Sequence, residues 1–125
     1  MAMKFRGLIV GLLFTLAASS ASAGTIVCTG KVLEIGYHQP GLVMLRIEGM
    51  NTAVYVCNLA ASWAAAGSLA AAAPPESCRA MLSAMMAAKA SGAVMQAVYF
   101  DGDAVPSSCG SFVAQSQVNV RHWLY

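Results

Sequence analysis

Charged side chains are scarce in this chain. Its 125 residues include only seven Lys and Arg, five Asp and Glu and two His. Nucleic-acid binding depends on clustered cations that neutralise phosphates, and scattered charges do not form such a patch. We therefore set aside nucleic acids and anionic membrane surfaces as partners. A small domain with so few charges has a largely uncharged surface. That favours self-association, although an alanine-rich composition explains it equally well.

A catalytic frame is also missing. A nucleophilic triad needs a serine or cysteine, a base and an orienting acid, and no Gly-x-Ser-x-Gly elbow is present. The two histidines are expected in ordinary positions, His38 in an exposed turn and His122 in a strand with its side chain partly buried. We therefore expect no enzyme activity, no catalytic residues and no cofactor.

Two pairs of carboxylates are possible acid–base pairs, because paired acids can cleave glycosides. The pairs are Glu34 with Glu48 and Asp101 with Asp103. The first pair is expected on separate strands and the second in a turn. Such positions are typical of solvated charges, so we interpret all four as surface groups.

The cysteine spacing does not match a zinc site. The four cysteines are 29, 21 and 31 residues apart, whereas zinc sites favour close Cys-x-x-Cys pairs. Methionine thioethers suit Cu(I) in an oxidising compartment. The candidates beyond the N-terminal segment are Met44, Met50, Met81, Met85, Met86 and Met95. Core packing explains them more simply, so copper binding is a remote alternative and we expect no metal site.

The apolar run near the N-terminus is too short to span a membrane. It covers residues 7–18, follows Lys4 and Arg6, and precedes small residues at Ala21 and Ala23. This pattern is typical of a signal peptide, whereas a spanning helix needs about 20 apolar residues. We expect residues 1–23 to be cleaved as a Sec-type signal, leaving one domain over 24–125 in the periplasm or outside the cell. Loss of Lys4 and Arg6 leaves the mature chain nearly neutral.

All four cysteines, Cys28, Cys57, Cys78 and Cys109, lie in the mature part. Four cysteines in a small exported domain predict two disulfides, for which three pairings are possible. A lipid anchor would require a cysteine directly at the cleavage site, and Cys28 lies beyond it.

Apolar residues alternate with polar ones in five segments, which predicts five strands. The first two cover 25–35 and 42–48 and flank Pro40-Gly41, a pair typical of a type II turn. A phase change near Gly30 indicates a bulge in the first strand. A third strand over 53–59 completes a meander, and strands over 94–100 and 117–125 follow.

One helix is predicted between the third and fourth strands. Pro74-Pro75-Glu76 suits a first helical turn, and Ser91-Gly92 suits the end. The apolar face expected to pack on the sheet consists of Cys78, Met81, Leu82, Met85 and Ala88. The alanine-rich connector, residues 60–73, has Trp63 and Leu69 as its only large apolar side chains. We expect a loop or one helical turn there, pinned by Trp63.

The order β-β-β-α-β-β predicts a mainly β domain, an OB-fold-like five-stranded antiparallel barrel whose helix closes one end. In such a barrel the first strand lies antiparallel to the fourth, which brings Cys28 near Cys109. The end of the third strand reaches the first turns of the helix, which brings Cys57 near Cys78. We predict these two disulfides. The second would fasten the connector and stabilise the fold by about 3 kcal/mol in the chain-entropy model.

Aromatic and polar side chains in the first hairpin and the last strand indicate a ligand site. Sugars bind to aromatic faces flanked by polar groups, and OB-fold barrels bind oligosaccharides on strands and loops near one end. The candidate residues are Tyr37, His38, Gln39, Arg121, Trp123 and Tyr125. The alternative is structural: Tyr55 nearby belongs to the core, and Trp123-Leu124-Tyr125 completes the last strand.

Short motifs along the whole domain carry a resemblance to a known family. They are Cys-Thr-Gly-Lys-Val-Leu at 28–33, Val-Cys-Asn-Leu at 56–59, Cys-Arg-Ala-Met-Leu at 78–82, Ala-Lys-Ala-Ser-Gly at 88–92, Val-Tyr-Phe at 98–100 and Ser-Cys at 108–109. With the expected barrel, they resemble small secreted OB-fold proteins related to the B subunits of AB-type bacterial toxins of the subtilase-cytotoxin and pertussis-like group. The resemblance implies a B subunit that binds cell-surface glycans as a pentamer and carries a separate toxic subunit.

Two functions of different kinds therefore stay open. The first is a non-enzymatic, ring-forming glycan binder. The second is a monomeric periplasmic interaction protein or enzyme inhibitor, for example of lysozyme, that acts through an exposed loop.

Overall fold

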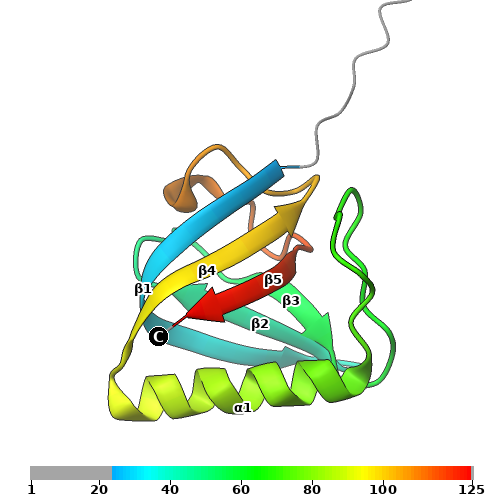
Figure 1. Ribbon diagram of the computed structural model, residues 1–125, viewed down its shortest axis with the longest axis horizontal. Coiled ribbons are helices and arrows are strands. Elements are labelled where there is room, and N and C mark those ends of the chain that lie inside the picture. The colour runs from blue at the N-terminus through cyan, green and yellow to red at the C-terminus, as the bar shows by residue number, and fades with distance from the viewer. Residues whose placement is uncertain (1–23, 125) are drawn as a thin grey trace, which may run out of the picture.

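The computed structural model describes residues 24–124 (Figure 1). The elements are β1 (Gly24–His38), β2 (Leu42–Ile47), β3 (Val54–Asn58), α1 (Pro75–Ser91), β4 (Val94–Gly102), a short 3-10 helix η1 (Cys109–Ser111) and β5 (Asn119–Leu124). This order confirms the expected arrangement of five strands and one helix. The expected signal peptide, residues 1–23, and Tyr125 lie outside the described residues.

The five strands form one antiparallel sheet in the order β3-β2-β1-β4-β5. Its two edges meet at a parallel bridge between Tyr55 of β3 and Gln117, just before β5. The Tyr55 amide donates to the Ser116 carbonyl at 2.9 Å, and the Val118 amide donates to the Tyr55 carbonyl at 3.0 Å. This contact brings the sheet into an OB-fold-like barrel, and α1 lies across one end of it (Figure 1). The predicted fold class is confirmed.

The 15-residue strand β1 serves both halves of the barrel. Its first half pairs with β4 and its second half with β2, and the pairing register shifts between Cys28 and Gly30. The shift confirms the bulge predicted near Gly30. Strand bulges increase local bending and twist, which allows one long strand to contribute to two faces of a small barrel.

The hairpin between β1 and β2 is confirmed, but its predicted turn type is wrong. The Gly41 amide donates to the His38 carbonyl at 3.1 Å, so the turn spans His38 to Gly41. The Gln39–Pro40 peptide bond is cis. Proline therefore occupies the third position of the turn, as in type VI, rather than the second position of a type II turn.

Helix α1 begins and ends where the sequence predicts. Pro74 precedes it with extended backbone, and Gly92 follows it in the left-handed conformation, where its amide reaches the last carbonyls. The buried face contains Cys78, Met81, Met85 and Ala88. Met81 and Met85 thus pack into the core as expected, and burying each side chain contributes about 1.5–3 kcal/mol.

The core lies between the curved sheet and α1. Along β2, Val43, Leu45 and Ile47 are buried while the intervening residues are half-buried, which confirms the predicted alternation. The largest fully buried apolar side chains from the other strands and loops are Phe100, Met95, Val54, Val98 and Val118. Tyr55 is buried as well and belongs to this core.

Both predicted disulfides are present. The Cα atoms are 5.9 Å apart in Cys28–Cys109 and 5.5 Å apart in Cys57–Cys78. Two disulfides in so small a domain indicate an oxidising compartment outside the cytoplasm. Among residues 24–124, no helix is long and apolar enough to cross a membrane.

Candidate functional site

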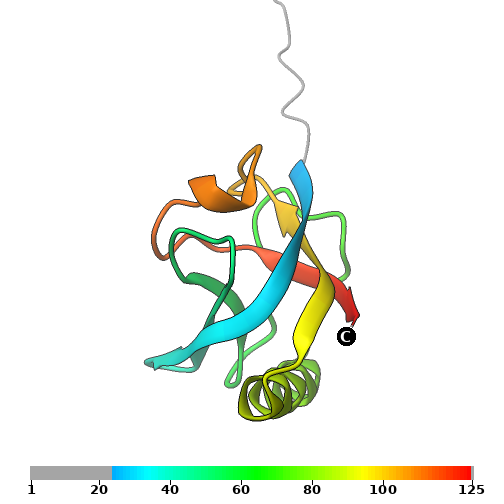
Figure 2. The ribbon, with the colours of Figure 1, turned by 90° about the vertical axis from the view of Figure 1, so that its left-hand side faces the viewer.

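The candidate ligand residues fall into two separate places. Tyr37 and His38 end β1 and Gln39 follows in the turn to β2; we call these three residues the hairpin tip. Arg121 and Trp123 lie on β5, whose end is well separated from the hairpin tip in two perpendicular views (Figures 1 and 2). Tyr125 lies outside the described residues. Each place therefore has to be assessed by its own geometry.

The hairpin tip carries an exposed aromatic ring. Tyr37 is 62% exposed. The ring of His38 meets that of Tyr55 edge-on at 5.8 Å, and its Nδ1 lies 2.8 Å from the Gln39 carbonyl oxygen. Among the described residues, no hydrogen bond engages the Tyr37 hydroxyl or the Gln39 side-chain amide. The tip thus combines one aromatic face with polar groups that are free to bind a ligand.

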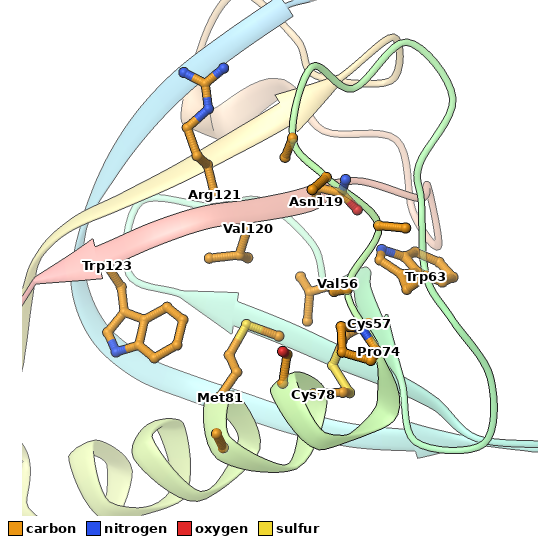
Figure 3. A pocket seen from close by; sticks show the side chains of 16 residues that line it. Val56, Cys57, Trp63, Pro74, Cys78, Met81, Asn119, Val120, Arg121 and Trp123 are labelled. Atoms are coloured by element: carbon orange, nitrogen blue, oxygen red, sulfur yellow. A yellow bond between two sulfur atoms is a disulfide. The ribbon is translucent and has the colours of Figure 1, made fainter.

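A second candidate site is a groove between β5, the first turns of α1 and the connector (Figure 3). Its volume is about 550 Å³. Large side chains that line it are Val56, Trp63, Met81, Val120 and Trp123, with the Cys57–Cys78 disulfide at one side. Figure 3 shows Val120 and Trp123 pointing from β5 toward Met81 on α1.

A bulge in β5 decides which side chains enter this groove. Val120 pairs with Phe100 and His122 with Tyr99, so Arg121 is an extra residue in the pairing with β4. The bulge changes the side-chain alternation. Trp123 consequently points into the groove with Val120, while the guanidinium of Arg121 points away from it (Figure 3). Arg121 Nη2 lies 3.9 Å from Asp101 Oδ2.

Two polar side chains along the groove, those of Trp63 and Asn119, are bound by the protein itself, and the Ser77 hydroxyl is a further polar group of the lining. The Trp63 indole Nε1 donates to the Val118 carbonyl at 3.0 Å. Asn119 uses both ends of its amide: Oδ1 accepts from the Ala65 amide at 3.2 Å, and Nδ2 donates to Ser68 Oγ at 2.7 Å. The groove therefore offers mainly an apolar lining.

Asp101 differs most from its expected position. It was expected to be solvated, but its exposed fraction is 0%. Its carboxylate accepts hydrogen bonds from Thr25 Oγ1 at 3.1 Å, Ser68 Oγ at 2.8 Å, and the amides of Leu69 and Ala70 at 2.9 and 3.2 Å. Burial alone would raise the pKa of Asp101, but these hydrogen bonds outweigh it and hold the pKa below its usual value. Asp103, its expected companion, is exposed.

These bonds order the alanine-rich connector, which contains no helix between residues 60 and 73. Trp63 and Ala73 exchange backbone hydrogen bonds of 2.9 and 2.8 Å, which closes residues 64–72 into a compact loop. Gly67 has a φ of 71°, and a Cβ there would overlap the Asp103 carboxylate. Trp63 pins the connector as expected. The Gly67-Ser68 break in the alanine run was the sequence signal of an ordered loop.

The remaining candidate groups have structural surroundings. His122 was expected to be partly buried, but it is exposed, because the bulge turns it outward, and its ring stacks on Tyr99 at 3.7 Å. Glu34 and Glu48 are exposed as predicted; Arg46 donates to Glu34 at 2.7 Å, and this hydrogen bond is the main cause that lowers the pKa of Glu34. Among residues 24–124, no group of three or more His, Cys, Asp or Glu side chains could hold a metal ion.

In comparisons with known proteins, no family model, no curated protein and no solved structure matches the chain. The resemblance to toxin B subunits therefore stays a prediction based on short motifs.

Proposed function

We propose that the mature chain is a non-enzymatic, extracytoplasmic binding domain that holds a sugar of a cell-surface glycan at the hairpin tip. The observation that carries this proposal is the exposed ring of Tyr37 two residues from Gln39, whose side-chain amide forms no hydrogen bond with the described part of the chain. The apolar face of a sugar stacks on an aromatic ring, while its hydroxyl groups need hydrogen-bond partners at the edge. The tip supplies both within three residues.

A single exposed site binds weakly, so the proposal includes association of copies. Several tips on one ring would engage one cell surface together, and linked sites gain affinity through effective concentration. The fullest form of the proposal is a pentameric ring that resembles a toxin B subunit and carries a separate toxic subunit. The sparse charge of the chain supports association, because copies repel one another little.

A glycan array probed with the exported, purified chain tests the sugar proposal, and native mass spectrometry tests the ring. We expect binding to a defined set of terminal sugars, with loss of the signal when Tyr37→Ala is probed on the same array. A blank array for the wild-type chain would remove the glycan function.

The second candidate is a monomeric interaction protein or enzyme inhibitor. The observation that favours it is Leu69, 78% exposed on the ordered connector loop. Inhibition of purified lysozyme by a strictly monomeric chain, together with a blank glycan array, would establish this function instead.

A further inference from the structure

The connector loop is longer than its connection requires. Cys57 and Cys78 are disulfide-bonded, and their Cα atoms are 5.5 Å apart, so the chain leaves β3 and returns to α1 at nearly the same point. The paired backbone of Trp63 and Ala73 closes the loop a second time. Residues 64–72 are thus an excursion beyond that closure. Compact loops of this kind, with their ends held together, frequently serve a function.

The turn of this loop is anchored by hydrogen bonds to the buried Asp101. Ser68, Leu69 and Ala70 all donate to one oxygen of the buried Asp101, and Asn119 also donates to Ser68. Hydrogen bonds to a buried carboxylate are stronger than those between neutral groups. The loop is therefore ordered before it contacts a binding partner. This lowers the entropic cost of a contact made through the loop.

The loop presents one large apolar side chain. Leu69 is 78% exposed, and residues 60–73 contain no charged residue. The other residues of the excursion are Ala, Gly and Ser, which are too small to hinder the approach of a partner surface. The result is an exposed surface centred on a leucine, with the carboxylate of Asp103 beside Gly67 as its charged neighbour.

The groove beside the loop has the complementary properties. It is concave, with a volume of about 550 Å³, and its walls carry indole, thioether and aliphatic groups. Arg121 is the only charged residue among the described residues that line it, and its guanidinium points away toward Asp101 (Figure 3). Trp63 and Asn119 use their polar atoms in hydrogen bonds within the protein. The groove therefore suits a branched apolar side chain.

We infer that copies of this chain associate by inserting Leu69 of one copy into the groove of another. The exposed Leu69 (the knob) and the mainly apolar groove (the hole) both lie on accessible surfaces of one chain, so a second copy supplies what each of them lacks. The inference rests on the part of the proposed function in which copies associate. A one-way contact of this kind is heterologous and forms a ring when the rotation between copies closes, whereas a reciprocal exchange of leucines ends at a dimer.

The test uses one defect in the knob and one in the hole. Leu69→Asp places a charge on the loop tip, and Ala80→Arg places one on the exposed groove wall of α1, where arginine suits a helix. Sedimentation velocity should show that wild type self-associates and that each variant alone associates about ten- to a hundredfold more weakly, as expected for losing one buried leucine. Val113→Asp is the matched control, because Val113 is 72% exposed but does not line the groove.

Mixing the two variants gives the decisive measurement. Ala80→Arg keeps a normal leucine and Leu69→Asp keeps a normal groove, so an equimolar mixture should recover complexes that neither variant forms alone. Recovery also shows that both variants are folded. Failure of two folded variants to complement each other would overturn the inference.

Other outcomes separate this inference from the proposed function. An assembly that persists unchanged in Leu69→Asp overturns the contact but leaves the ring standing. A wild-type chain that stays monomeric up to about 1 mM overturns both. Binding of a monomer to phosphatidylcholine vesicles, lost in Leu69→Asp, would assign the leucine to a lipid surface and overturn the inference as well.

Discussion

The hairpin tip and the groove both contain residues that the sequence predicts to bind a ligand, but the two regions differ in whether their polar atoms are already hydrogen-bonded within the protein. At the tip, Tyr37 is exposed, and no other residue within 24–124 hydrogen-bonds to its hydroxyl. In the groove, the polar atoms of Trp63 and Asn119 are bound by the protein, and the lining is apolar. The tip is therefore suited to a polar ligand such as a sugar, and the groove to an apolar side chain. An aromatic residue alone does not distinguish these cases; its polar neighbours do.

The largest expected effect comes from removing the support of the groove. Asp101→Ala leaves the hydroxyl of Ser68 and the amides of Leu69 and Ala70 without their shared acceptor. We expect the free energy of unfolding to fall by about 3–5 kcal/mol, as when one partner of a buried charged network is removed. Urea denaturation measures this change. Asp103→Asn, on the exposed neighbouring carboxylate, is the control and should change stability by less than about 0.5 kcal/mol. Equal effects would show that Asp101 does not hold the loop.

The disulfide beside the groove should contribute somewhat less. The double variant Cys57→Ala, Cys78→Ala opens a loop with a sequence separation of 21 residues. The chain-entropy model predicts a loss of about 3 kcal/mol. Hydrogen exchange adds the spatial information: amides of residues 60–73 should lose protection first, while the hairpin tip keeps its exchange rates. Uniform loss of protection would mean that the groove and the tip are not independent regions.

A pair of aromatic substitutions compares the two regions directly. Tyr37→Ala should weaken sugar binding by about tenfold or more, because truncating an aromatic anchor costs more than about 1 kcal/mol. Trp123→Ala should leave sugar binding unchanged and weaken self-association instead, since its side chain lines the groove. Glycan binding and sedimentation of both variants give a two-by-two comparison. If each variant impairs both sugar binding and self-association, the assignment of these two properties to separate regions is wrong.

The fold was predictable because its signals are local or follow from topology. Strand alternation, the proline start of α1 and its Gly92 stop each depend on neighbouring residues. Once the β-β-β-α-β-β order is assigned, barrel geometry places Cys28 beside Cys109 and Cys57 beside Cys78. The cis peptide before Pro40 has no such signal, because a proline pattern is compatible with several turn types.

The site was harder to predict because it depends on distant residues. Asp101 looks solvated in the sequence, and only the fold brings Thr25 and Ser68 to its carboxylate. The bulge at Arg121 has a similar effect: simple alternation places Arg121 and Trp123 on one face, but one extra residue separates them. The predicted ligand residues thus came from suitable residue types, and their grouping required the three-dimensional structure.

The smallest expected effect is the pH dependence that Asp101 contributes at the loop beside the groove. The folded state lowers the pKa of Asp101 from a usual value of 3.8, so the unfolded chain binds its proton more readily. The stabilisation is complete above about pH 5 and decreases as the pH falls through the unfolded and then the folded pKa. Asp101→Asn, which cannot titrate, should flatten the acid limb of the stability curve measured by urea denaturation between about pH 5 and 2. Exchange of the Leu69 and Ala70 amides over the same range locates the effect. If the tip residues respond to acid and these two amides do not, the carboxylate at the loop is not the group that couples proton binding to folding.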